Sequence, residues 1–287
     1  MKVSTLGLMA TIGLVTLTGT GASAATIYSA NDWYAQYSQL SSITNGGTTS
    51  PTVNYATTGT GFGSVWSYFA PDASPVALES GMSMTLNTAI TVVYQEGVTP
   101  VAKDFRFGLF NSGTRPSTPG SRIYTGSTST FSNFVNGWTG FMTSNVQSQS
   151  TSNQIWRRDD GATGTAYSSS GNTTRVGLTD GFSALTLFPN NGVVSLSLTL
   201  QRAGDDLSFY GSLGGETFSG VYANAFAGGY PVVFDSVGFW GATEMGGLSS
   251  VTLAGTTVTV VPEPAVSALL VGALGSLYLL RRRSRVA

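Results

Sequence analysis

The stretch Val194-Ser195-Leu196-Ser197-Leu198-Thr199-Leu200-Gln201 alternates apolar and polar residues without a fault. Neighbouring side chains of an extended chain point to opposite faces, so one face receives four aliphatic side chains and the other receives hydroxyl groups. The stretch therefore predicts a β-strand with one buried and one exposed face. It is the strongest periodic segment of the chain, and the body of the chain shows no long helical period.

The residues that follow extend this strand into a three-stranded antiparallel meander. Arg202–Asp206 has the composition of a turn, and the alternation resumes at Leu207–Phe209. Gly214-Gly215 is typical of a two-residue hairpin connection, after which Glu216–Phe218 returns as the third strand.

Similar short patterns predict more strands outside the meander. They are Met82–Leu86, Phe105–Leu109, Phe182–Phe188, Val232–Trp240 and Ser250–Val260. One short helix is expected over Asp32–Leu40, with Asn31 as its N-cap. Three long polar segments, Asn111–Thr130, Thr143–Gln154 and Arg157–Arg175, are expected to be loops, and loops of that length are usually functional or mobile.

Many strands without a repeat indicate an all-β domain over residues 25–260. We expect a two-sheet antiparallel sandwich or jelly roll. A β-helix is the alternative, but it would show a repeat that the sequence lacks.

Composition excludes several classes of function. The 287 residues include no histidine and no cysteine, which removes the commonest general base, the commonest metal ligand and any disulfide. Residues 25–260, the body of the chain, contain 8 basic and 13 acidic residues and so carry a net charge of −5. Nucleic-acid binding requires a basic face, so we expect no such partner.

The acidic pairs are Asp159-Asp160 and Asp205-Asp206. A retaining glycosidase needs two carboxylates about 5–5.5 Å apart, whereas adjacent strand residues point to opposite faces. Both pairs lie beside glycine, where aspartate commonly stabilises turns. Oxygen ligands near Asp159-Asp160 leave calcium open as a cofactor, although Arg157 and Arg158 could neutralise the same acids. We therefore expect no enzyme activity and no other cofactor.

Three tryptophans are candidate glycan contacts: Trp138, Trp156 and Trp240. They lie at strand ends or beside long loops, where an exposed ring could stack on a sugar. The alternative is that they belong to the core, since large aromatic side chains are mostly consumed by packing.

Residues 1–24 have the features of a secretory signal peptide. Lys2 supplies the positive charge and Leu6–Leu17 the apolar region. Ala22-Ser23-Ala24 matches a signal-peptidase cleavage site, in which Ala22 and Ala24 are the two required small residues. We expect passage through the Sec translocon, cleavage by signal peptidase and a mature chain that starts near Ala25.

Residues 261–287 have three parts: Pro262-Glu263-Pro264, an apolar segment over 265–280 and a basic end over 281–287 that includes Arg281, Arg282 and Arg283. Prolines end regular structure, and arginines remain in the cytoplasm. We expect residues 265–280 to form a transmembrane helix, since sixteen apolar or small residues in a helix reach most of the way across a bilayer. An ordinary tail anchor is the alternative, but a permanent span typically needs about 17–25 residues.

This order of parts resembles the PEP-CTERM sorting signal of Gram-negative bacteria. The resemblance implies an exosortase as partner and removal of the tail. It also implies transient residence in the inner membrane, followed by the cell surface, the outer membrane or the extracellular polysaccharide matrix.

A second resemblance concerns the body. The order of Trp66–Phe69, Val76–Leu78, Phe105–Asn111, the Leu196 meander and Phe234–Phe239 is similar to concanavalin A-like (LamG-like) jelly rolls. That fold serves lectins, glycosidases and inert spacers. We expect a structural or adhesive surface module; the alternatives are a carbohydrate-binding module and, less favoured because no acid-bearing strand is present, a glycoside hydrolase.

Overall fold

The computed structural model describes one compact unit, Ala24–Pro262. Within it, the described residues are 24–36, 40–56, 63–71, 74–98, 105–113, 122–124, 137–145, 154–159, 173–177, 188–230, 232–241 and 247–262. Two eight-stranded sheets make up nearly all of this part. Its helical content is a single 3-10 turn, η1, at Ala227–Gly229.

The first sheet, called sheet A, has the strand order β15-β14-β13-β7-β18-β4-β3, and β1 also pairs with β18. Its strands are β1 (Thr26–Ser29), β3 (Leu40–Thr44), β4 (Thr52–Tyr55), β7 (Met82–Tyr94), β13 (Val193–Ala203), β14 (Asp206–Leu213), β15 (Glu216–Tyr222) and β18 (Leu248–Pro262). All of its pairings are antiparallel.

The second sheet, called sheet B, has the order β12-β11-β10-β8-β17-β5-β2-β9. Its strands are β2 (Asp32–Gln36), β5 (Gly63–Tyr68), β8 (Phe105–Asn111), β9 (Arg122–Tyr124), β10 (Thr139–Asn145), β11 (Gln154–Arg158), β12 (Thr173–Gly177) and β17 (Ser236–Gly241). Only the pair of β2 and β9 is parallel in this described sheet. A small ribbon of β6 (Val76–Ala77) and β16 (Val233–Phe234) completes the strands.

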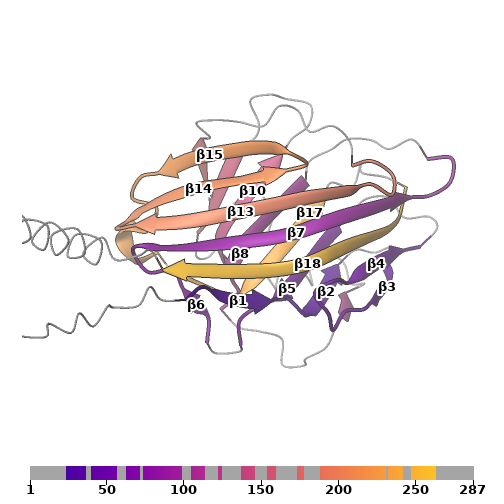
Figure 1. The fold of residues 1–287 in the computed structure, drawn as a ribbon, viewed down its shortest axis with the longest axis horizontal. Coiled ribbons are helices and arrows are strands. Elements are labelled where there is room, and N and C mark those ends of the chain that lie inside the picture. The colour runs from indigo at the N-terminus through magenta and orange to yellow at the C-terminus, as the bar shows by residue number, and fades with distance from the viewer. Residues whose placement is uncertain are drawn as a thin grey trace, which may run out of the picture. The chain divides into compact units, whose positions relative to one another are not determined.

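The two sheets form a sandwich. Sheet A lies in front in Figure 1, and the strands of sheet B cross behind it obliquely. One apolar cluster takes side chains from both sheets, and the rings of Phe107 on β8 and Phe218 on β15 meet edge to face at 6.5 Å. The predicted all-β antiparallel sandwich is therefore confirmed, and the β-helix is excluded.

The alternating pattern that decides the fold lies on β13. Val194, Leu196, Leu198 and Leu200 are all buried, whereas Ser195 is exposed. The predicted meander is also confirmed: β13, β14 and β15 pair in sequence, and Gly214 and Gly215 form the second turn with φ of 62° and 92°.

The predicted strands at residues 82–86, 105–109 and 250–260 lie within β7, β8 and β18. The prediction at 232–240 is divided in two, since Asp235 separates β16 from β17. Of the predicted strand Phe182–Phe188, residues 182–187 lie outside the described residues, and Phe188 is a buried residue without strand pairing.

The predicted helix over Asp32–Leu40 is wrong. Residues 32–36 form β2 and residue 40 begins β3, so Asn31 caps no helix. Trp33 packs in the core between the sheets, whereas Tyr34 packs on the other face of sheet B. Only an extended chain buries consecutive aromatic residues on opposite sides, and this packing overrides the weak helical signal.

The three predicted loops are also shorter than expected. β9 lies inside Asn111–Thr130, residues 143–145 belong to β10, and residues 154–158 and 173–177 form β11 and β12. Their polar sequences carry little of the apolar alternation by which strands are recognised, so the pairing partners determine their conformation.

The described residues contain no helix long and apolar enough to span a membrane. Residues 1–23 and 263–287 lie outside the described part, so it does not test the predicted signal peptide or the apolar segment at 265–280. Pro262 is described and is the last residue of β18, paired with Met82.

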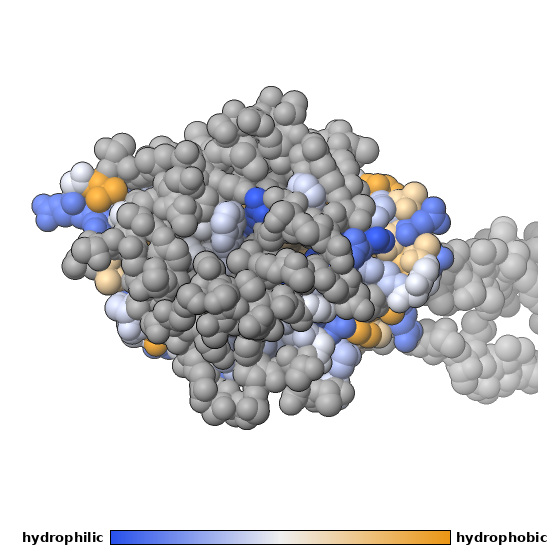
Figure 2. Space-filling model, turned by 180° about the vertical axis from the view of Figure 1, so that it is seen from behind, coloured by the Kyte–Doolittle hydropathy of each residue, from blue (hydrophilic) through white to orange (hydrophobic). Residues whose placement is uncertain are grey.

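Large exposed hydrophobic residues in the described part all belong to sheet A; they are Ile27, Val193, Tyr210, Val221 and Val261. Seen from the side of sheet B, small hydrophobic patches of described residues lie towards the two ends (Figure 2).

The facing of β13 can be tested by a pair of substitutions. Leu198→Ala should lower the free energy of unfolding by about 2–5 kcal/mol, because this side chain is fully buried between the sheets. Ser195→Ala, on the exposed face of the same strand, should change it by less than about 0.5 kcal/mol. Urea unfolding followed by tryptophan fluorescence measures both, and equal losses would contradict the assigned facing.

Candidate functional site

The outer face of sheet A carries two neighbouring rows of polar side chains, all short except Tyr210, that run across five strands from β18 to β15. The first row is Thr257, Asn87, Ser197, Ser212 and Thr217, and the second is Thr259, Thr85, Thr199, Tyr210 and Ser219. The rows are two residues apart on each strand and therefore share one face. We call these ten residues the hydroxyl face.

Hydrogen bonds tie hydroxyl groups of neighbouring strands together. The hydroxyls of Ser197 and Ser212 are 3.0 Å apart, and those of Thr85 and Thr199 are 2.9 Å apart. A hydroxyl has one donor and two acceptor positions, so each pair retains capacity for a further partner. In the second pair this capacity lies on Thr85, because Thr199 is buried. The pairs also hold the side chains in place, which reduces the entropy that a ligand would have to remove.

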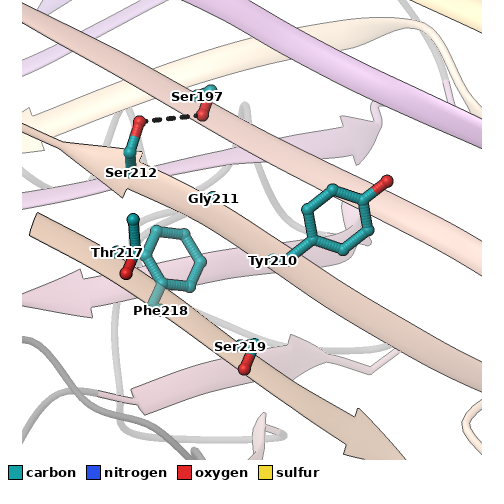
Figure 3. Close-up of a pocket in the computed structure, with 7 residues that line it drawn as sticks. All are labelled: Ser197, Tyr210, Gly211, Ser212, Thr217, Phe218 and Ser219. Atoms are coloured by element: carbon teal, nitrogen blue, oxygen red, sulfur yellow. Dashed lines mark hydrogen bonds between the residues drawn. The ribbon is translucent and has the colours of Figure 1, made fainter. Parts of the chain in front are cut away.

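Two hollows lie on this face. The first has a volume of about 510 Å³ and is lined by Ser197, Tyr210, Gly211, Ser212, Thr217, Phe218 and Ser219. Figure 3 shows the Ser197 and Ser212 hydroxyls facing each other, with the Tyr210 ring to one side. The second hollow, of about 410 Å³, is lined by Asn87, Thr88, Ala89, Ser195, Leu196, Ser197, Ser212, Ala254 and Gly255.

Gly211 forms the floor of the first hollow. A side chain at this position would collide with the Ser197 carbonyl oxygen and with the Phe218 ring. Phe218 fills the space beneath the glycine and is itself buried. The close approach of the two strands here therefore requires glycine.

Tyr210 is the aromatic residue that the hydroxyl face exposes. Its side chain is 46% exposed, and it pairs with Thr199 on one side and Ser219 on the other. An exposed ring between hydroxyl groups can stack on an apolar sugar face while its neighbours form hydrogen bonds.

The hydroxyl face carries no charge. The charged residues of β13, β14 and β15 lie at the strand ends, at Arg202, Asp206 and Glu216. Nor does the described part contain a group of three or more acidic, histidine or cysteine residues that could hold a metal ion.

The three candidate tryptophans lie on the other side of the molecule, on the outer face of sheet B. Trp138 is fully buried there in an aromatic cluster with Tyr34, Trp66, Tyr68, Phe110 and Met142. Trp156 and Trp240 are partly buried and pack against this cluster, and the Arg106 guanidinium lies 4.9 Å from the Trp240 ring. For Trp138 this is the core position that the sequence left open as the alternative.

The candidate acidic residues have structural partners. Arg157 Nε donates to Asp159 Oδ1 at 2.6 Å, whereas Asp160 lies outside the described residues. Asp205 and Asp206 lie at the β13–β14 hairpin, where Asp206 Oδ1 accepts a hydrogen bond from the Asn224 N–H at 2.8 Å. Their place at a turn agrees with the sequence prediction, whereas the Asn224 hydrogen bond ties this turn to the segment after β15.

Arg157 belongs to a cation–aromatic cluster. Its guanidinium lies 5.3 Å from the Tyr222 ring and 4.8 Å from the Tyr230 ring, and its Nη1 donates to the Ala225 carbonyl. Burial raises the pKa of the Tyr230 phenol well above its usual value, so this hydroxyl remains protonated and donates to the Arg158 carbonyl. The cluster fastens the segment after β15 to β11.

Sequence reasoning found part of the hydroxyl face. The alternation in 194–201 placed hydroxyl groups on one side of one strand. The sequence does not predict the two rows, because they depend on the pairing of β13 with β7 and of β7 with β18. The paired residues are separated by more than 100 positions along the chain.

No family model and no curated protein matches this chain. Similar solved structures include the basic lectin of winged bean with Tn-antigen, at 9% identity over 83% of this chain and 98% of that chain, with a TM-score of 0.46. The carbohydrate recognition domain of Emp46p in a potassium-bound form is 10% identical over 84% of this chain and 89% of that one, with a TM-score of 0.43. Peanut lectin with a peptide is 8% identical over 83% of this chain and 96% of that one, with a TM-score of 0.41. At TM-scores below 0.5, these likenesses decide neither fold nor function, which rest on the strand pairing and the residues described above.

Proposed function

We propose that this chain is a non-catalytic carbohydrate-binding protein whose ligand lies on the hydroxyl face of sheet A. The observation that carries the proposal is the exposed Tyr210 ring beside rows of uncharged hydroxyl groups over a hollow of about 510 Å³. Sugars combine hydroxyl groups with an apolar ring face, and this surface offers a partner for each.

The order of the strands in two antiparallel sheets supports a concanavalin A-like type of sandwich. A purely structural or adhesive role is the second candidate. It would use the same hydrated surface without recognising a particular sugar, so a binding experiment separates the two.

Tyr210→Ala should weaken glycan binding about tenfold, because the loss of a stacked ring removes roughly 1.4 kcal/mol. Tyr210→Phe should retain most of the affinity, since it keeps the ring. The measurement is a glycan array with the full-length chain, followed by calorimetric titration of the best ligand.

Val193→Ala is the matched control. Val193 is a large apolar residue, 69% exposed on the other end of β13, and it lines neither hollow. It should leave binding unchanged. If no glycan binds, or if both alanine variants lose affinity equally, a ligand on the hydroxyl face is rejected, and absence of binding favours the structural role.

We further propose that the chain is exported and sorted by an exosortase, which recognises the Pro262-Glu263-Pro264 motif and removes the C-terminal tail. The geometry of the chain ends supports this. β18 ends at Pro262, and Thr26 pairs with Val260, so the folded unit begins and ends on one pair of strands. The predicted signal-peptide cleavage site and the sorting motif therefore adjoin completed structure, and removal of the segments beyond them would leave every strand of the sandwich whole.

Replacement of Pro262, Glu263 and Pro264 by alanine should leave the C-terminal segment attached in a bacterium that contains the exosortase. Intact-mass measurement of the exported protein distinguishes the two results, because an unprocessed variant is heavier by the mass of the tail. Arg281, Arg282 and Arg283 replaced by glutamine form a second variant that alters the basic end alone. Unchanged processing of the alanine variant would refute the sorting assignment without affecting carbohydrate binding.

A further inference from the structure

The two hollows of the hydroxyl face are shallow and adjoin each other, and we call them together the groove. Ser197 and Ser212 line both of them, so the hollows meet at the hydrogen-bonded hydroxyl pair. The first hollow continues to β15 at Thr217 and Ser219, and the second continues to β18 at Ala254 and Gly255.

This groove is much longer than a single sugar. Neighbouring strands lie about 4.8 Å apart, so five strands span roughly 19 Å from the first to the last. A monosaccharide would contact only one of the two hollows. Four neighbouring strands instead each present a short polar side chain of the first row to the groove, whereas β18 contributes Ala254 and Gly255; the four are Asn87, Ser197, Ser212 and Thr217. Polar partners at such regular intervals suit a chain of linked sugar units.

The twist of the hydroxyl face favours a single polysaccharide chain over a flat crystalline polysaccharide as the ligand. Neighbouring strands are rotated by roughly 20–25°, so a row across five strands follows a twisted path. A single flexible chain can follow that path, whereas a flat crystalline surface would touch only part of it.

The lining of the groove also constrains the charge of the ligand. None of the residues that line either hollow is charged. An acidic polysaccharide would have to place carboxylates against a surface without lysine or arginine, at a cost in desolvation that no ion pair offsets.

From the groove and its lining we propose that the ligand is a neutral polysaccharide chain that lies across the strands from β18 to β15 and fills both hollows. The proposal rests on carbohydrate binding by the hydroxyl face and adds the class of ligand and its direction.

The experiment titrates the full-length chain with gluco-oligosaccharides of increasing length, in the α-1,4 and β-1,4 series, and with oligogalacturonates of matched length. For a neutral series, affinity should rise at least about tenfold from the monosaccharide to a length that fills both hollows and then level off. It should change less than about twofold between low and high salt, because screening acts on charges.

Two variants test whether one chain fills both hollows. Asn87 lines the second hollow and Thr217 lines the first. Asn87→Ala and Thr217→Ala should each weaken binding of the long oligosaccharide about three- to tenfold, because each removes a hydrogen bond to it. Thr52→Val is the control, since Thr52 lies on the same sheet beside Thr252 and lines neither hollow. It should bind like the original chain.

The outcomes separate the two levels of the proposal. Affinity that is already complete with the monosaccharide, or that depends on one hollow alone, overturns the polymer but leaves a carbohydrate site. A preference for oligogalacturonates with steep salt dependence overturns neutrality. Absence of binding by every glycan on the array and in both series rejects the site together with its ligand.

Discussion

The pairing of β7 with β13 and β18 is the constraint on which the remaining structure depends. β7 is 13 residues long and lies between the other two strands. It keeps one register with β13 throughout, and one register with β18 over residues 257–262, beyond a shift between Ala254 and Thr257. Leu86 faces Leu198 and Val258 across this register, and these side chains point into the core. One position along, Asn87 faces Ser197 and Thr257 on the outer side. A slip by one residue would exchange the two sets, so burial of the aliphatic side chains also fixes the hydroxyl face.

The two sheets use their outer faces differently. Sheet B is apolar on both sides, since Trp33 and Val65 lie in the sandwich core while Tyr34 and Trp66 pack on the opposite face. The outer side of sheet A carries hydroxyl groups that bond to one another, with separate exposed apolar residues such as Val193 and Val221 among its strands. Aromatic side chains on sheet B therefore stabilise the fold, whereas those of sheet A that reach solvent, such as Tyr210, remain available to a ligand.

The sequence predicts those elements whose two faces differ in polarity. β13 and β7 were identified from alternation, because the core side and the solvent side differ at every second residue. β2 was mistaken for a helix because both of its faces are buried, so no alternation marks it as a strand. β11 lay hidden in polar sequence for a related reason, since Arg158 is fully buried with its Nε donating to the Trp138 carbonyl, and a buried arginine gives no apolar signal. Prediction of the complete hydroxyl face requires the order of the strands in sheet A, and local sequence patterns do not contain that order.

The ends of the folded unit and the hydroxyl face share a strand, and this relates the proposed sorting to the proposed binding. β18 contributes Thr257 and Thr259 to the two rows and ends at Pro262. A side chain at Thr259 lies on the face opposite Val260, which is buried between β1 and β7. Removal of the residues beyond Pro262 would take away no member of either row and no pairing partner of β7. Removal of the tail would therefore leave the β-sandwich unchanged, and its hydroxyl face would be complete before and after processing.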